Sequence, residues 1–118
     1  MIHGYLTDIN DNCLFEKVLR TSSFLERLCG LLFSPPLKQK EALLIEPCSS
    51  VHTVGMRYAI DVVFIDKNWH VVKTAKSLKP WRMAASSKAY RVLELASDSL
   101  EQIDLPSGQQ LKWHNHVE

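Results

Sequence analysis

Chemically active side chains are concentrated between Ser50 and Asp61, in the stretch SVHTVGMRYAID. A proline precedes this stretch, a glycine interrupts it, and Ser, Thr and Val fill much of the rest, so we expect loop or extended chain there instead of helix. In an extended chain, side chains four positions apart are separated by roughly 13 Å, so Cys48, His52 and Met56 would lie too far apart to share one metal ion. We therefore predict neither a metal nor a cofactor.

Asp61 is the sharpest anomaly, because it interrupts the apolar run AIDVVFI. A carboxylate inside a core must be paired or hydrogen-bonded, since leaving it unpaired costs several kcal/mol. Two interpretations fit. Asp61 either caps a turn or binds backbone amides that fix the loop before it, or it forms a charge-coupled pair with His52 that lines a pocket. Arg27, Arg57 and Arg82 are further candidate partners.

Two other groups of residues suggest chemistry. A folded loop could bring Cys48 and His52 together as a nucleophile and its base or as part of a metal site, although a packed thiol and a carbonyl-bonded imidazole are the simpler interpretation. Trp81 and Arg82, in LKPWRM, place an aromatic surface beside a guanidinium, which suits stacking or carboxylate recognition; the alternative is an aromatic lid over one end of a barrel. The catalytic candidates are His52, Asp61 and Cys48. The ligand-binding candidates are Arg27, Ser50, His52, Thr53, Met56, Arg57, Asp61, Trp81 and Arg82.

Short strands are the elements that must position these residues. Alternating or continuous apolar patterns predict strands at 1–7, 13–19, 41–48, 59–66, 70–78 and 89–96, with a last strand after the turn in PSGQQLKW. The first two form a hairpin through DINDN. In the turn DKNW, Asn68 is the residue expected to have a positive φ. A short helix in SDSLEQIDL would be capped by Ser97 or Ser99.

One longer helix is predicted in RTSSFLERLCGLLFSPPL, where leucines recur at helical intervals and two prolines end the pattern. Cys29 is expected on its apolar side. The chain therefore reads as one domain, residues 1–118, of the α+β class but mainly β. We expect a small barrel-like or curled antiparallel or mixed sheet, with the main helix in the N-terminal third.

Composition excludes several classes of partner. The balance of 14 basic and 13 acidic residues leaves a net charge of +1, which favours neither nucleic acid nor an anionic membrane surface. The basic residues between Lys67 and Arg91 lack an aromatic platform motif, so no nucleic-acid binding is predicted. No secretory signal and no run of roughly 20 apolar residues is evident, so we predict a cytoplasmic protein without membrane insertion. Three cysteines without paired spacing predict reduced thiols.

The segments RLCGLLF, SVHTVGMRYAIDVVFID, LKPWR and VLELA, in this order and spacing, resemble the bacterial and archaeal family named domain of unknown function 192. The resemblance covers about Arg20 to Trp113. It implies a small, mainly β domain without an established activity, often exported or membrane-anchored in other members; this chain shows no signal or anchor. It also implies one spatial cluster formed by Arg27, His52, Thr53, Met56, Asp61 and Trp81.

Three functional hypotheses follow. The first is a binding module whose polar pocket around 50–57, with Arg27 and Trp81, recognises a small polar ligand, a peptide end or another protein surface. The second is an enzyme, such as a hydrolase, that uses His52 with Asp61 and has Cys48 or Thr53 as nucleophile. The third is a structural or interaction domain in which the same residues only hold the fold closed.

Overall fold

A computed structural model gives the structure of the protein, of which residues 1–23 and 36–116 are described. The helix predicted between Arg20 and Leu37 falls mainly outside these residues, as do Arg27 and Cys29. The described elements are β1 (Ile2–Asp8), β2 (Cys13–Arg20), β3 (Glu41–Ile45), β4 (Ser50–His52), β5 (Ile60–Ile65), β6 (Val71–Leu78), β7 (Met83–Ala85), β8 (Arg91–Ala96), α2 (Ser99–Gln102) and β9 (Leu111–Asn115). The mainly β prediction is confirmed.

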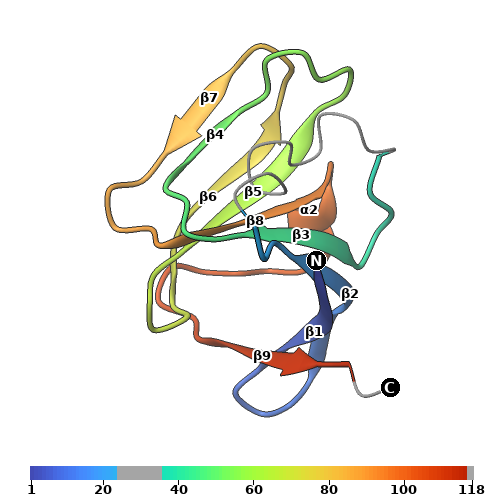
Figure 1. Cartoon of the computed structure of the whole chain (residues 1–118), viewed down its shortest axis with the longest axis vertical. Coiled ribbons are helices and arrows are strands. Elements are labelled where there is room, and N and C mark those ends of the chain that lie inside the picture. The colour runs from blue at the N-terminus through green and yellow to red at the C-terminus, as the bar shows by residue number, and fades with distance from the viewer. Residues whose placement is uncertain (24–35, 117–118) are drawn as a thin grey trace.

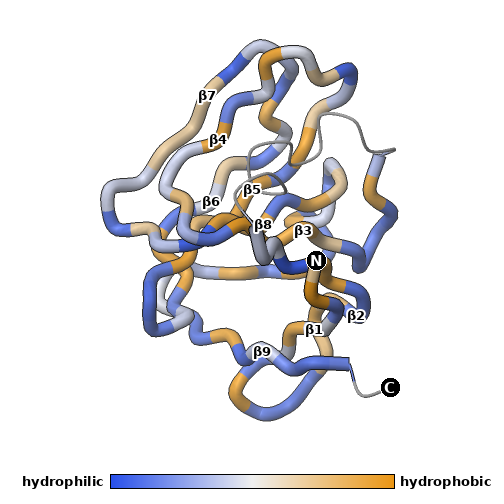
Figure 2. The backbone as a smooth tube through the Cα atoms, viewed as in Figure 1, coloured by the Kyte–Doolittle hydropathy of each residue, from blue (hydrophilic) through white to orange (hydrophobic). Residues whose placement is uncertain are grey.

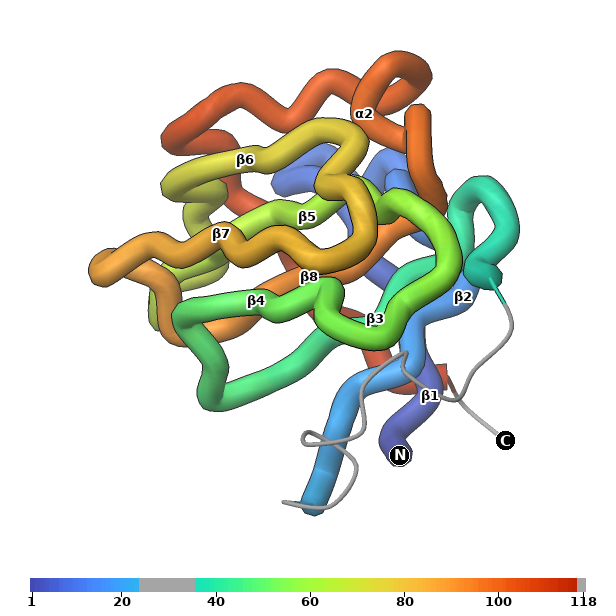
Figure 3. Tube along the Cα trace, turned by 90° about the horizontal axis from the view of Figure 1, so that it is seen from above, coloured from blue at the N-terminus to red at the C-terminus, as the bar shows by residue number. Residues whose placement is uncertain are grey.

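Seven of the strands form one sheet, in the order β6-β5-β8-β3-β2-β1-β9. Strands β2 and β3 pair in parallel, and the other neighbours are antiparallel, so the sheet is mixed. Strands β4 and β7 form a separate antiparallel sheet that lies beside one face of the main sheet (Figures 1 and 3). We call this two-stranded sheet the ribbon. Among the described helices, none has the length and apolar character needed to cross a membrane.

The main sheet does not close into a barrel within the described residues, so that part of the prediction is wrong. Among the described residues, the segments that begin β6 and β9 meet at one corner, around the isolated bridge between His70 and Gln110. There the Val71 N–H donates to the Gln109 carbonyl at 2.8 Å, the Gly108 N–H to the Val71 carbonyl at 2.7 Å and the Leu111 N–H to the Trp69 carbonyl at 2.8 Å. Beyond that corner, β6 pairs with β5 and β9 pairs with β1. Because no ladder runs along β6 and β9, the two edges stay separate.

Both faces of the central strands are buried, as the continuous apolar pattern of β5 predicts. Figure 2 shows this apolar character along much of β5 and β8. One face supports an α2-side cluster: Leu6, Phe15, Val18, Ala42, Leu44, Val63, Ile65, Val71, Leu93, Leu95, Leu100, Leu105 and Leu111. The other supports a ribbon-side cluster: Leu43, Ile45, Val51, Met56, Ile60, Val62, Phe64 and Val92. The ribbon is therefore attached to the sheet by apolar packing.

Two local predictions are wrong for identifiable reasons. The residue with positive φ in the β5–β6 turn is Trp69 (φ 68°), because the Asp66 carboxylate accepts the N–H groups of both Asn68 and His70 and thereby sets the turn one residue later. Helix α2 has Asp98 at its N-cap without a side-chain cap, so neither Ser97 nor Ser99 performs that role.

A close approach of β9 to β1 depends on Gly4. An added Cβ at this position would lie 2.3 Å from the His114 carbonyl oxygen and 2.4 Å from the Trp113 ring. The Trp113 ring in turn lies 5.1 Å from the Arg20 guanidinium. Gly4 therefore leaves space for an aromatic ring that packs across the first strand.

Candidate functional site

The ribbon has an inner and an outer face. Val51 and Ala84 are register partners and pack on the ribbon-side cluster, whereas the next pair, His52 and Met83, is exposed. Alternation along an antiparallel pair explains this division, because neighbouring residues point to opposite faces. His52 therefore stands on the outer surface, opposite a methionine. Strand β7, which the sequence pattern does not indicate, is the element that brings these two residues together.

Thr53 fixes the turn at the end of the ribbon. Its buried hydroxyl lies 2.6 Å from the Lys79 carbonyl oxygen, to which it donates, and accepts the Arg82 N–H at 2.8 Å. The Thr53 backbone N–H donates to the Arg82 carbonyl at 2.9 Å, and the Thr53 carbonyl accepts from the Trp81 and Met56 N–H groups, each at 3.1 Å. One small side chain and its backbone thus satisfy the polar groups of two turns. Thr53 is a positioning residue inside the fold.

The turns that Thr53 holds present a surface that combines apolar and basic groups. Trp81 and Met83 are 66% and 63% exposed, and Val54 is also exposed, so three of the six exposed large apolar residues among those described are near this end of the ribbon. Arg57 and Arg82 are exposed as well. Trp81 has a positive φ of 63°, a conformation that non-glycine residues rarely adopt and that here turns the chain at the tip. We call Val54, Arg57, Lys79, Trp81, Arg82 and Met83, with His52, the ribbon surface.

Asp61 lies on the α2 side of the main sheet, away from the ribbon surface. It is 1% exposed, and its two carboxylate oxygens accept the backbone N–H groups of Ser77 at 2.8 Å and Leu100 at 2.9 Å. Because Ile60 and Val62 belong to the ribbon-side cluster, strand alternation directs Asp61 to the α2 side of the sheet, away from His52. In the described part of the chain, no hydrogen bond or ion pair joins Asp61 to His52. Asp61 binds backbone amides, but those of β6 and α2 instead of those in the preceding loop.

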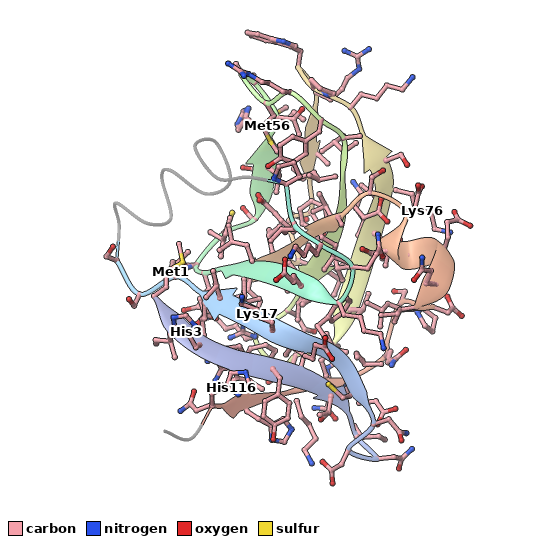
Figure 4. The ribbon with its side chains drawn as sticks, turned by 90° about the vertical axis from the view of Figure 1, so that its right-hand side faces the viewer. Met1, His3, Lys17, Met56, Lys76 and His116 are labelled. Carbon is pink, nitrogen blue, oxygen red and sulfur yellow. The ribbon has the colours of Figure 1, made fainter. Side chains whose placement is uncertain are left out.

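The remaining predicted site residues have separate surroundings. Met56 is buried in the ribbon-side cluster and appears at the ribbon end of the molecule in Figure 4. The Cys48 thiol donates to the Ser50 carbonyl at 3.0 Å and lines a shallow hollow of about 250 Å³ with Pro47, Ser49, Ala89 and Tyr90. Arg27 falls outside the described residues. Among the residues that the structure describes, no three His, Cys, Asp or Glu side chains are grouped to hold a metal ion.

Glu94 is a buried acid that the sequence analysis does not single out. It lies in β8 between Leu43 of β3 and Val62 of β5, is 6% exposed, and its Oε2 atom has no hydrogen-bond partner among the described residues. Burial raises the pKa of Glu94 to about 7. In VLELA, an acid that alternates with leucines indicates a solvent-facing position, and it is the ribbon that covers this face.

The sequence analysis also does not identify a cluster of charged residues at three strand ends, the end of β2, the end of β3 and the start of β8. Glu46 accepts hydrogen bonds from Arg20 and from Arg91, the latter at 2.7 Å, and the Arg91 guanidinium lies 3.8 Å from the Trp69 ring centroid. The side chains of both arginines and of Glu46 are largely buried. Because each carboxylate oxygen serves one guanidinium, the three residues satisfy one another. The cluster has the character of a structural network.

Comparisons with known proteins agree on the fold. The sequence model of a family described as "Uncharacterized ACR" matches residues 8–113. A UPF0127 protein of Pyrococcus horikoshii is 33% identical over 109 residues, which are 86% of this chain and 92% of the relative. A solved structure of a protein of unknown function from Novosphingobium aromaticivorans has a TM-score of 0.73 at 18% identity, covering 94% of this chain and 84% of that one.

A second solved structure, a proposed transcription regulator of Sinorhizobium meliloti, has a TM-score of 0.78 at 14% identity and covers 95% of this chain and 92% of that one. At these low identities the two solved structures establish a shared fold and nothing more.

Proposed function

The chain belongs to the family named domain of unknown function 192, or UPF0127, and we propose that this member is a binding module whose ribbon surface recognises the carboxylate end of a peptide. The single observation that carries the proposal is the hydrogen-bond set of Thr53, which holds an exposed tryptophan and an exposed arginine next to each other at the ribbon tip. These hydrogen bonds hold the backbone of Trp81 and Arg82, so less backbone conformational entropy is lost when a partner binds.

The charges around the ribbon favour an anionic partner. Residues 47–60 and 67–93 contain no Asp or Glu, although the chain as a whole is nearly neutral. Lys79, Arg57 and Arg82 therefore stand on a surface without nearby carboxylates from these segments. Such a surface attracts an anion from solution, and a guanidinium can bind a carboxylate with two parallel hydrogen bonds.

The exposed apolar side chains of the ribbon surface indicate a second property of the ligand. Trp81 and Met83 expose large side chains beside the cations, and a free carboxylate alone would leave these side chains in water. A peptide end carries both chemistries, since its terminal carboxylate is adjacent to a side chain that can be apolar. We therefore propose chain ends with a large apolar last residue as the preferred class of ligand.

The test uses N-acetylated tetrapeptides that end in leucine or phenylalanine with a free carboxylate, and C-amidated copies of the same peptides. Amide chemical shifts of the ¹⁵N-labelled protein are followed as each peptide is added. We expect shifts for Thr53, Trp81 and Arg82 with the free carboxylates, and affinity at least about fivefold weaker for the amides, because the amides lack a charge-assisted hydrogen bond.

Two variants sharpen the test. Arg82→Gln should weaken binding of the free carboxylate by about fivefold to tenfold, whereas Lys112→Gln, which removes the same charge from β9, should leave binding unchanged. Equal binding of carboxylates and amides, or no binding of either, would refute the proposed function.

A further inference from the structure

Glu94 lies in the apolar layer between the main sheet and the ribbon. Along β8 it alternates with Leu93 and Leu95 of the α2-side cluster and shares its face with Val92 of the ribbon-side cluster. Its register partners are Leu43 and Val62. The Oε2 atom is buried and has no hydrogen-bond partner in the described part of the chain. A carboxyl group in this position can remain neutral but cannot be ionised without exposure to water or a cation.

One cation lies on this side of the sheet among the described residues, the exposed Lys73, whose ammonium stands 5.7 Å from the Phe64 ring centroid and donates to the Ala85 carbonyl, and it makes no hydrogen bond to Glu94 Oε2. The strands next to Glu94 contribute Leu43 and Val62, the ribbon contributes Val51 and Ala84, and the loop after it contributes Met56. Besides Lys73, the titratable groups that the described residues pack against the same cluster include the Tyr58 phenol and the Cys48 thiol. Burial, and then the charge of Glu94, raise the pKa of Tyr58, so this phenol also stays neutral near Glu94.

Ionisation of Glu94 would act mainly on the ribbon. Strands β3, β5 and β8 are joined by continuous ladders, whereas the described residues attach the ribbon by apolar contacts, by the Lys73 ammonium, which donates to the Ala85 carbonyl at 2.7 Å, and by the Cys48 N–H, just before β4, which donates to the Tyr90 carbonyl at 2.8 Å. When a buried carboxylate must reach water, the element with the fewest hydrogen bonds to its neighbours is the one that moves. That element is the ribbon.

We propose that Glu94 is a proton-dependent control of the ribbon surface: neutral Glu94 lets the ribbon pack on the sheet and present Trp81 and Arg82, and ionised Glu94 displaces the ribbon and weakens binding there. The regulated event rests on the proposed function, because it is the binding of a peptide carboxylate. Ionisation opposes that binding in a second way, since it places a negative charge behind an anion-binding surface. Burial sets the transition near pH 7.

The first experiment measures affinity for the N-acetylated tetrapeptide ending in leucine between about pH 6 and pH 8. If only the form with neutral Glu94 is competent, the apparent dissociation constant of the wild type should rise about tenfold over this interval. Glu94→Gln, which stays neutral and has a similar shape, should keep the pH 6 affinity throughout. A decline in Glu94→Gln equal to that of the wild type would overturn the proposal.

His52 is the confounding group, because a histidine on the same surface would also favour an anion at low pH. The variant His52→Gln removes this imidazole and should still show the tenfold decline. If the decline is lost in His52→Gln and retained in Glu94→Gln, the histidine is the controlling group and the proposal is wrong.

A second measurement needs no ligand and so separates this proposal from the proposed function. Hydrogen exchange of the Cys48 amide reports separation of the ribbon from the main sheet, since this N–H, just before β4, donates to the Tyr90 carbonyl, just before β8, at 2.8 Å. For each amide, the protection factor in the wild type is divided by the protection factor in Glu94→Gln. This ratio should fall at the Cys48 amide as pH rises from about 6 to 8, and it should stay constant for amides that pair β1 with β2. A constant ratio at the Cys48 amide would refute the control by Glu94 even if peptides bind.

Discussion

The Oδ2 atom of Asp61 in β5 accepts the backbone N–H of Leu100 in α2 at 2.9 Å, across 39 residues of sequence. Because α2 has no side-chain cap from its own N-terminus, this distant carboxylate satisfies one of its free N–H groups. The other oxygen binds the Ser77 N–H, where β6 has a positive φ of 51°. Asp61 thereby ties a helix and an irregular strand to the centre of the sheet.

Replacing Asp61 with Asn should lower the free energy of unfolding by about 1–3 kcal/mol, because one carboxylate oxygen becomes an NH₂ group that faces a backbone donor. His52→Ala, on the exposed face of the ribbon, should change the same quantity by less than about 0.5 kcal/mol. Urea denaturation measures both. Equal and large losses would show that His52 is also part of the folding framework.

The stability of the protein should depend on the ionisation of Glu94. Its pKa in the folded state, about 7, lies above the ordinary value of 4.5, so the neutral form stabilises the fold fully below pH 4.5 and this contribution is lost as pH rises through about 7. At about 1.4 kcal/mol per pH unit between the two pKa values, the loss at high pH is about 3 kcal/mol.

Urea denaturation at pH 5 and pH 8.5 measures this loss. Glu94→Gln should remove most of the difference between the two conditions. The exposed Glu101→Gln is the matched control and should keep the wild-type difference. An unchanged pH dependence in Glu94→Gln would show that another group titrates.

The Arg20–Glu46–Arg91 network should be sensitive to loss of its single acid. Glu46→Gln leaves two largely buried guanidinium groups without a carboxylate, and breaking a buried pair in this way costs about 3 kcal/mol or more. Glu101→Gln removes only an exposed pair with Lys76, whose side chain is labelled beside the short helix in Figure 4, and should cost at most about 1 kcal/mol. Similar losses of unfolding free energy for the two variants would contradict a structural role for the network.

Gly4→Ala tests the close packing of β9 on β1. The added methyl group would meet the Trp113 ring and the His114 backbone, and only the ring can move. We expect a loss of about 1–3 kcal/mol in unfolding free energy, with a change in the NMR signals of the Trp113 indole. Gly108→Ala provides a comparison without crowding, because nothing lies within 4 Å of an added Cβ there, although its φ of 95° carries a backbone cost. An unperturbed Trp113 signal in Gly4→Ala would contradict the predicted clash.

The sequence predicts most of this fold because the strands of the main sheet carry their own signals. Apolar runs and alternation in the amino-acid sequence alone mark β5, β6 and β8. Strand β7 has no such signal: Met83, Ala84 and Ala85 are weak strand formers, and they are extended because the hydrogen bonds of Thr53 bring this segment to β4. In β7, a tertiary contact and not the strand propensity of the residues determines the extended conformation.

The candidate site is predicted less completely, for a related reason. The sequence shows that Asp61 needs partners, but backbone amides carry no residue-specific signal, so Ser77 and Leu100 cannot be recognised in advance. Glu94 is missed because its alternation with Leu93 and Leu95 is typical of a strand with one face in water. Only the position of the ribbon shows that this face is covered.

The pairing of β1 with β9 has a consequence for biosynthesis. Strand β1 can pair with β2 as soon as both leave the ribosome, but its second neighbour follows about a hundred residues later. Until then, one edge of β1 keeps its N–H and C=O groups unpaired and open to strands of other nascent chains. The β1–β2 turn, DINDN, contributes two aspartates at one end of this edge, and charged side chains at a sheet edge disfavour pairing with other strands.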